Sequence, residues 1–78
     1  MADNDAYNIG FEYISDTAAH IGRFGKLYAL ADAVIASAVI QNASGNAFTS
    51  VPLAAGDEIY GVFTSVTLAS GKVVAYRI

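Results

Sequence analysis

His20 is the only histidine in this 78-residue sequence, and Ser15 and Asp16 lie shortly before it. Serine, histidine and aspartate are the side chains of a nucleophilic triad, but a triad needs a geometry that this short spacing does not specify. We interpret His20 as a loop histidine or as a hydrogen-bonded packing residue. The sequence therefore indicates no catalytic residue, and we expect the protein not to be an enzyme.

Carboxylates occur in two places where a metal or an acid–base pair could be sought. Asp3 and Asp5 resemble the start of a calcium loop, but the glycine and the distal glutamate of such a loop are missing. Asp57 and Glu58 are adjacent, and neighbours in an extended strand point to opposite faces. With no cysteine in the chain either, we expect no metal and no other cofactor.

Aromatic and glycine residues offer two further binding chemistries. The tyrosines are Tyr7, Tyr13, Tyr28, Tyr60 and Tyr76. Their rings could stack on sugars or bases, but tyrosines in a β-rich chain are more typical of rims and interfaces, because one end of the side chain is apolar and the other polar. The segment "GRFG" (residues 22–25) lacks the lysine and the glycine spacing of a phosphate loop, so we interpret it as a tight turn.

The composition indicates a subunit that needs neighbours. Hydrophobic residues make up 55% of the chain and charged residues only 14%, against about 25% in an ordinary soluble domain. A domain of this length buries only about 60% of its unfolded surface. Exposed apolar patches usually mark interfaces. We therefore expect a homo-oligomer in which other copies complete the core.

The charge pattern argues against two classes of partner. The formal net charge is −3, and the basic residues Arg23, Lys26, Lys72 and Arg77 are scattered. Nucleic-acid binding needs a basic face, so we expect no nucleic acid. The start is acidic where a signal peptide would be basic, and polar residues interrupt the longest uncharged stretch, residues 33–56. We therefore expect the protein to be made in the cytoplasm and not to associate with a membrane.

We expect a flexible arm over residues 1–6 and a single β-rich domain over residues 7–78. Alternating residues in 7–15 predict a half-buried strand with the aromatic side chains on one face. Residues 15–25 then predict a connection in which Gly22 and Gly25 take backbone angles that other residues resist.

Residues 27–40 are ambiguous. Their apolar spacing fits a helix and the alanines favour one. However, several residues are β-branched, and Asp32 could separate two short strands.

The last third of the chain predicts turns and long strands. Turn clusters occur at 41–48 and 52–58. Apolar residues change parity between Phe63 and Val66, which predicts a β-bulge near Thr64 and Ser65. Residues 69–72 predict a hairpin turn with Gly71 at positive φ. Residues 73–78 would return as the partner strand, buried on both faces.

Most of the chain resembles a family of small virion proteins from tailed bacteriophages. The resemblance lies in "GRFG", in "GDEIYGVFTS" and in "LASGKVVAY". It implies a β-rich module, often homotrimeric, found alone or at the end of a longer fibre. It also implies that residues 27–40 form two strands joined near Asp32. The short segment before the module favours a free-standing decoration protein over a fibre tip.

We therefore expect an all-β, mainly antiparallel fold, a small barrel or sandwich-like module with a C-terminal β-hairpin, assembled as a trimer. The alternative is an α+β fold with a helix at about 27–40. The predicted interface with other subunits or the capsid comprises Tyr7, Phe11, Phe24, Tyr28, Ile59, Phe63, Val66 and Tyr76.

The expected function is that of a capsid decoration or cement protein located in the virion. Its partners would be other copies of itself and the phage major capsid protein. One alternative is a fibre-associated or spike-associated module that attaches to glycans on the host surface. Another is a non-viral β-rich oligomer that serves as an enzyme subunit or small-molecule binder.

Overall fold

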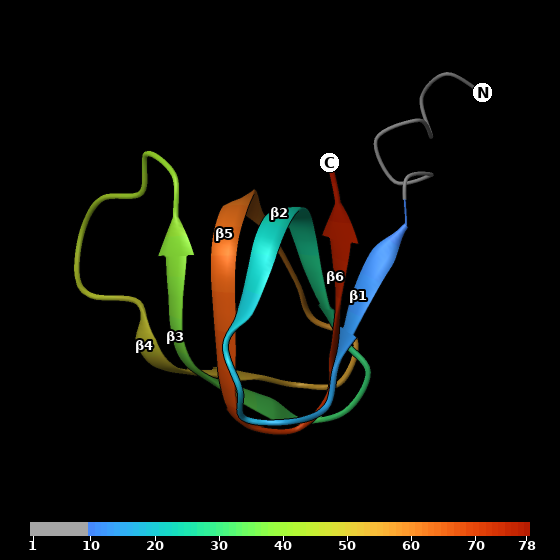
Figure 1. Cartoon of the computed structure of the whole chain (residues 1–78). Helices are drawn as coiled ribbons and strands as arrows, with labels where there is room; N and C mark the ends of the chain where they lie inside the picture. Colours follow the sequence, from blue (N-terminus) through green and yellow to red (C-terminus); the bar gives the residue numbers. More distant parts are fainter. Residues whose placement is uncertain (1–9) are drawn as a thin grey trace.

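The computed structural model describes residues 10–78, and over that range the chain forms six strands and no helix (Figure 1). The strands are β1 (Phe11–Ile14), β2 (His20–Ala29), β3 (Ala33–Ile40), β4 (Thr49–Leu53), β5 (Glu58–Ser70) and β6 (Val73–Arg77). They form one sheet in the order β1-β6-β2-β5-β3-β4, and every neighbouring pair is antiparallel. The prediction of an all-β antiparallel fold is confirmed. The predicted arm at 1–6 and the predicted interface residue Tyr7 lie outside the described residues.

Residues 27–40 belong to two strands rather than to a helix. β2 ends at Ala29 and β3 begins at Ala33, with a bend between them. Burial alternates with a period of two on both sides of the bend, since Leu27, Ala29, Ala33 and Ile35 are buried. The helix alternative is therefore wrong, because two short β-patterns separated by a bend happen to imitate helical spacing. The expectation of two strands joined near Asp32 is confirmed.

β5 carries the bulge that the change of parity predicts. Phe63 and Val66 are both fully buried although they are three positions apart. In the pairing with β3, Val39 lies opposite Ser65 and Ile40 lies opposite Phe63, so Thr64 is the extra residue. A bulge bends its strand and increases the local twist. This bend lets one strand keep its apolar side chains on the inner face of a curled sheet.

The core lies on the concave side of this sheet, where β2 and β5 curve most strongly (Figure 1). Its largest fully buried side chains are Phe24, Phe63, Ile14, Leu27, Ile35, Leu68, Val66 and Val73. They come from β1, β2, β3, β5 and β6. One curved sheet thus encloses a core from side chains on one of its faces, with β1 and β4 at its two edges.

Gly22 and Gly25 lie inside β2, which begins at His20, so the predicted connection is shorter than expected. Neither glycine has a positive φ, and the prediction of unusual backbone angles is wrong. They are instead sites of close packing. A Cβ at Gly22 would lie 2.8 Å from the ring of Phe24, and a Cβ at Gly25 would collide with the side chain of Ile78.

The predicted C-terminal hairpin is wrong, although its turn is present. Gly71 has a φ of +89°, as expected. However, β6 pairs with β1 and β2, and β5 pairs with β2 and β3. β2 therefore lies between the two strands, and the backbone amide of Leu30 donates a hydrogen bond to the carbonyl of Lys72 (3.0 Å) at the crossing. Burial of β6 on both faces is confirmed, since Val73, Val74 and Ala75 are all buried.

Candidate interaction surface

The convex side of β1, β6, β2 and β5 gathers most of the aromatic side chains of the described chain. Strand register aligns Phe11, Tyr76, Lys26 and Tyr60 in one row across the four strands. The next row on the same side consists of Tyr13, Val74, Tyr28 and Glu58. Side chains of directly paired residues point to the same face of a sheet. We call these eight residues the aromatic face.

Side chains within the first row contact one another. The rings of Phe11 and Tyr76 meet edge to face, with centroids 5.8 Å apart. The Lys26 ammonium lies 5.0 Å from the centroid of Tyr76 and 5.7 Å from that of Tyr60. Such cation–π contacts are electrostatically favourable and place the lysine between two rings. The row is therefore a connected layer rather than a set of independent rings.

Glu58 joins this layer to the second row. The Tyr60 hydroxyl donates to Glu58 Oε1 at 2.9 Å, and Lys26 Nζ lies 3.6 Å from Glu58 Oε2. The positive lysine thus has its counter-ion on the neighbouring strand. An apolar surface that neutralises its own charges can be covered by another surface at lower desolvation cost.

Three of these aromatic side chains remain largely exposed. Phe11 is 53% exposed, Tyr13 51% and Tyr60 63%. In β1 the aromatic residues point outward, whereas Ile14 is fully buried on the inner side. The alternation in the sequence predicts a strand with aromatic side chains on one side and polar residues on the other. In the structure the aromatic side of β1 points outward. Exposed aromatic side chains are enriched at protein interfaces.

The predicted interface residues divide into three groups. Phe11, Tyr28 and Tyr76 lie together on the aromatic face. Ile59 is half-buried and packs against the core.

Phe24, Phe63 and Val66 are at most 1% exposed in the single chain, so the structure corrects them from interface to core. They fill the concave side at the bend of β2 and β5, where no surface is left for a partner. Residue type could not separate the two roles, since core and interface use the same apolar side chains.

Tyr13 and Tyr60 lie on the aromatic face but were not in the predicted interface set, and neither were Lys26, Glu58 and Val74. A signal for the two tyrosines existed, since both lie in strand-like segments and tyrosines are typical of rims and interfaces. What the sequence could not give was the neighbour relation between β1, β6, β2 and β5. That relation depends on long-range register.

His20 lies near one end of the same sheet in a cluster of charged side chains. Its Nδ1 lies 2.8 Å from Glu12 Oε2 on β1, and its Nε2 lies 2.8 Å from Asp16 Oδ1 in the β1–β2 connection. The other Glu12 oxygen accepts from Arg77 Nη2 on β6 at 2.7 Å. The histidine is a hydrogen-bonded packing residue, as one of the two sequence interpretations holds. The contributions of Glu12 and Arg77 were missed by the sequence reasoning because they lie on other strands.

Hydrogen bonds in this cluster shift two protonation equilibria. Those from His20 to Glu12 and to Asp16 raise the pKa of His20 above its ordinary value of 6.5. The hydrogen bond to His20, followed by that from the Ala18 amide, lowers the pKa of Asp16 below its ordinary value of 3.8. Both shifts favour the ion pair of imidazolium and carboxylate.

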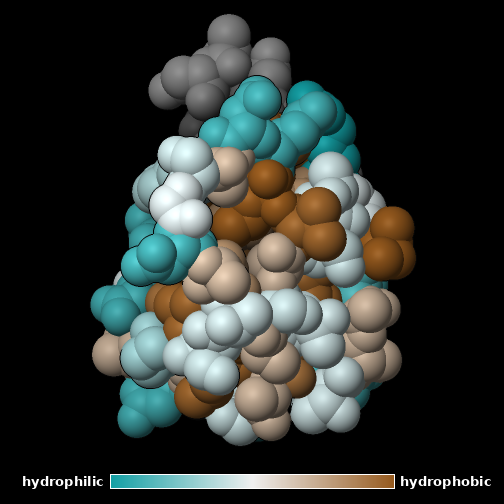
Figure 2. Space-filling view, turned by 90° about the vertical axis from the view of Figure 1, so that its left-hand side faces the viewer, coloured by the Kyte–Doolittle hydropathy of each residue, from teal (hydrophilic) through white to brown (hydrophobic). Residues whose placement is uncertain are grey.

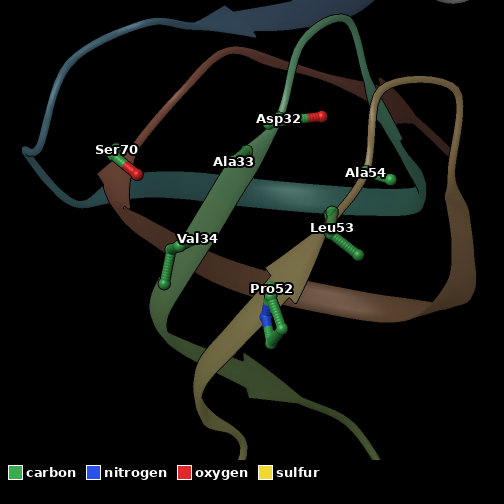
Figure 3. A pocket seen from close by; sticks show the side chains of 7 residues that line it. All are labelled: Asp32, Ala33, Val34, Pro52, Leu53, Ala54 and Ser70. Atoms are coloured by element: carbon green, nitrogen blue, oxygen red, sulfur yellow. The ribbon is translucent and has the colours of Figure 1, made fainter.

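Two open hollows lie on the opposite half of the sheet. One, of about 480 Å³, lies between the ends of β3 and β4 and is lined by residues 32–34, residues 52–54 and Ser70 (Figure 3). Its one carboxylate, on Asp32, accepts a hydrogen bond from the Ala55 amide at 3.0 Å. That bond ties the β4–β5 turn to the bend before β3, which is a structural role.

The second hollow, of about 310 Å³, lies beside the loop of residues 41–48 and includes Val39, Ile40 and Phe48 in its lining. Figure 2 views the molecule from the side of β4 and this loop, and hydrophobic side chains form separate patches among polar ones there. On the aromatic face, by contrast, strand register places five aromatic side chains in two adjacent rows, together with Val74 and the ion pair of Lys26 and Glu58.

Over residues 10–78, no group of three or more histidine and carboxylate side chains is arranged to hold a metal ion. The same part of the chain has no helix that could span a membrane. Comparisons with protein-family models, with curated proteins and with solved structures found no match.

Proposed function

We propose that this protein is a structural virion protein, a homotrimeric decoration or cement protein that binds the outer surface of a phage head and stabilises the shell. In this proposal the aromatic face packs against the neighbouring copy. Other surfaces of the trimer then remain available for the major capsid protein. The protein works through binding rather than through catalysis.

The observation that carries the proposal is the concentration of aromatic side chains on one exposed face. Phe11, Tyr13, Tyr28, Tyr60 and Tyr76 come from four strands, and the register brings them together. Contiguous exposed apolar surface of this kind usually marks an interaction site. Aromatic side chains bury much area with little loss of conformational freedom, which suits a permanent contact.

The small size of the subunit supports a second copy as the occupant of this face. A 78-residue domain has a limited core of its own. Closed cyclic symmetry covers one such face on every subunit and leaves no copy with it exposed. The resemblance to small phage virion proteins, which are often trimers, points to the same assembly.

The rings of Tyr60 and Tyr76 flank Lys26, which occupies space between them. A glycan-binding platform needs open ring faces on which a sugar can stack. The geometry of this row therefore favours a protein partner over the glycan-attachment alternative.

The assembly is tested by measuring the mass of the protein in solution by light scattering. We expect a trimer for the wild type and a monomer for the double variant Phe11→Ser, Tyr60→Ser. The matched control is Ile21→Ser, Val39→Ser, which removes two side chains that are 75% and 60% exposed in other parts of the sheet. We expect this control to remain a trimer. A wild-type monomer at micromolar concentration, or loss of assembly only in the control, would contradict the proposed interface.

The virion role is tested with expanded shells of the phage that encodes this chain, prepared without the protein. We expect the added protein to bind to saturation and to raise the temperature at which the shells release DNA. The monomeric variant should bind less tightly and protect less. Binding to host cells together with no binding to shells would replace the decoration role with glycan attachment.

A further inference from the structure

The side-chain cluster around His20 joins β1, β2 and β6, and each of these strands contributes residues to the aromatic face. Among residues 10–78, β1 is an edge strand that pairs only with β6. It supplies Phe11 and Tyr13 to the aromatic face and Glu12 to the cluster. Whatever fixes β1 in the sheet therefore also fixes part of the aromatic face.

Both nitrogens of the His20 ring face carboxylate oxygens at 2.8 Å. A neutral imidazole carries one N–H and one lone pair, whereas an imidazolium carries two N–H groups. In the neutral ring one lone pair would therefore point at an ionised carboxylate that can only accept. Only the imidazolium can donate to Glu12 and Asp16 at the same time.

Arg77 extends the connection from His20 to the β1 backbone. Its Nη1 donates to the carbonyl of Phe11 at 2.8 Å, and its backbone amide donates to the carbonyl of Gly10 at 3.0 Å. Its Nη2 donates to the same Glu12 carboxylate that His20 contacts. Within the described residues, the charged groups around His20 are thus Glu12 on β1, Asp16 in the connection and, through Glu12, Arg77 on β6. On β5, the residue paired with His20 is Val66, which does not titrate.

We propose that protonated His20 is a pH-dependent clamp that holds β1 in the sheet, and that its deprotonation loosens β1 and with it Phe11 and Tyr13 of the aromatic face. The link from β1 to assembly rests on the proposed function, in which that face is the subunit contact. The clamp itself depends only on the cluster.

The sign of the effect follows from the direction of the shift. The pKa of His20 is raised in the folded chain, so its stabilisation is complete below 6.5 and is lost as the pH rises through the higher folded value. The pKa of Asp16 is lowered, so its contribution is present above 3.8 and is lost as the pH falls through the lower folded value. The clamp is therefore strongest between these two ordinary pKa values. One pKa unit corresponds to a factor of ten in an equilibrium constant. Deprotonation of His20 should therefore increase the opening of β1 about tenfold for each unit by which the pKa of His20 is raised in the folded chain.

The clamp is tested by amide hydrogen exchange of the intact protein at pH 6 and pH 8.5, corrected for the intrinsic effect of pH on exchange. We expect protection of the β1 amides to fall at least several-fold at the higher pH, while that of β5 changes little. The single histidine also allows its titration to be followed by NMR without ambiguity. Glu12→Gln and Asp16→Asn should each lower the pKa of His20.

Two variants at the same position separate charge from packing. His20→Lys keeps a positive charge across this range, so β1 should be protected at both pH values. His20→Gln has no charge, so β1 should be weakly protected at both. Wild-type pH dependence of β1 protection in His20→Gln, or an unshifted His20 titration in the wild type, would overturn the clamp.

Light scattering at the same two pH values distinguishes failure of the clamp from failure of the proposed function. Loss of the trimer at pH 8.5 in the wild type but not in His20→Lys supports the whole inference. A pH-dependent β1 in a protein that is a trimer at both pH values overturns the link to assembly and leaves the clamp. A monomer under all conditions refutes the proposed subunit contact, while the exchange data still decide the clamp.

Discussion

At the scale of single residues, glycines in this chain serve two different purposes. Gly56 and Gly71 have nearly the same positive φ, +91° and +89°. A Cβ at Gly56 would meet nothing within 4 Å, whereas one at Gly71 would collide with the backbone and side chain of Ala33 and with the Asp32 carbonyl. Gly56 is thus needed only for its backbone angle, and Gly71 also for its lack of a side chain.

This difference predicts unequal effects of the same substitution. Gly56→Ala should lower the free energy of unfolding by about 1 kcal/mol, which is the strain of an L residue at positive φ. Gly71→Ala should cost about 1–3 kcal/mol more, because the added methyl group forces the bend before β3 to move. Urea unfolding of both variants measures the difference. Equal losses would mean that the contact between Gly71 and Ala33 does not constrain the fold.

At the scale of secondary-structure elements, the main feature is that β2 separates β5 from β6. The turn after β5 has the glycine and the length of a hairpin turn. However, it passes the end of β2, so that β5 and β6 pair with opposite edges of β2. In this arrangement β6 lies between β1 and β2, with neighbours on both edges. The buried pattern of β6 follows from that central position.

Engineered cysteine pairs test this strand order directly, because the chain has no cysteine of its own. Phe11 and Tyr76 are paired on β1 and β6, so Phe11→Cys with Tyr76→Cys should form a disulfide on mild oxidation. A hairpin between β5 and β6 with its turn at residues 69–72 would instead place Ser65 opposite Tyr76. The pair Ser65→Cys with Tyr76→Cys should therefore stay reduced within the chain. Mass spectrometry distinguishes the two, and the opposite outcome would restore the hairpin.

Features that depend on a few neighbouring residues could be predicted from the sequence. The change of parity between Phe63 and Val66 gave the bulge at Thr64, and Gly71 gave a turn with positive φ. Each follows from local geometry, namely the period of two along a strand and the freedom of glycine. The bend near Asp32 that separates β2 from β3 is different, because local spacing alone left a helix and two strands both open.

Strand order and the role of each face could not be predicted in this way. Any strand with an apolar face could pair with β5 through its backbone groups. Nothing in the local sequence therefore shows that β2 rather than β6 lies beside β5. The same limit applies to the aromatic face. Tyr28 and Tyr76 were predicted to lie at an interface, but so was Phe63, which is fully buried, because burial depends on the curvature of the whole sheet.

At the scale of the whole molecule, one curved sheet has its core on the concave side and its aromatic face on the convex side. Val74, on that convex side, is only 7% exposed and lies between Tyr13 and Tyr28 in register. The tyrosines thus already cover part of the sheet within one subunit. A partner would complete a layer that the subunit begins, so folding and association should stabilise each other.

Such coupling predicts that thermal stability depends on protein concentration. Unfolding of a trimer releases three chains, so mass action favours the folded state at higher concentration. With about 0.7 kcal/mol of unfolding enthalpy per residue, a hundredfold increase in concentration should raise the Tm of a folding-coupled trimer by roughly 10 °C. Scanning calorimetry over that range measures the shift. The Phe11→Ser, Tyr60→Ser variant should have a lower Tm that no longer changes with concentration, whereas Ile21→Ser, Val39→Ser should keep the dependence. A constant Tm in the wild type would mean that the single chain is stable alone and that association through the aromatic face contributes nothing to its stability.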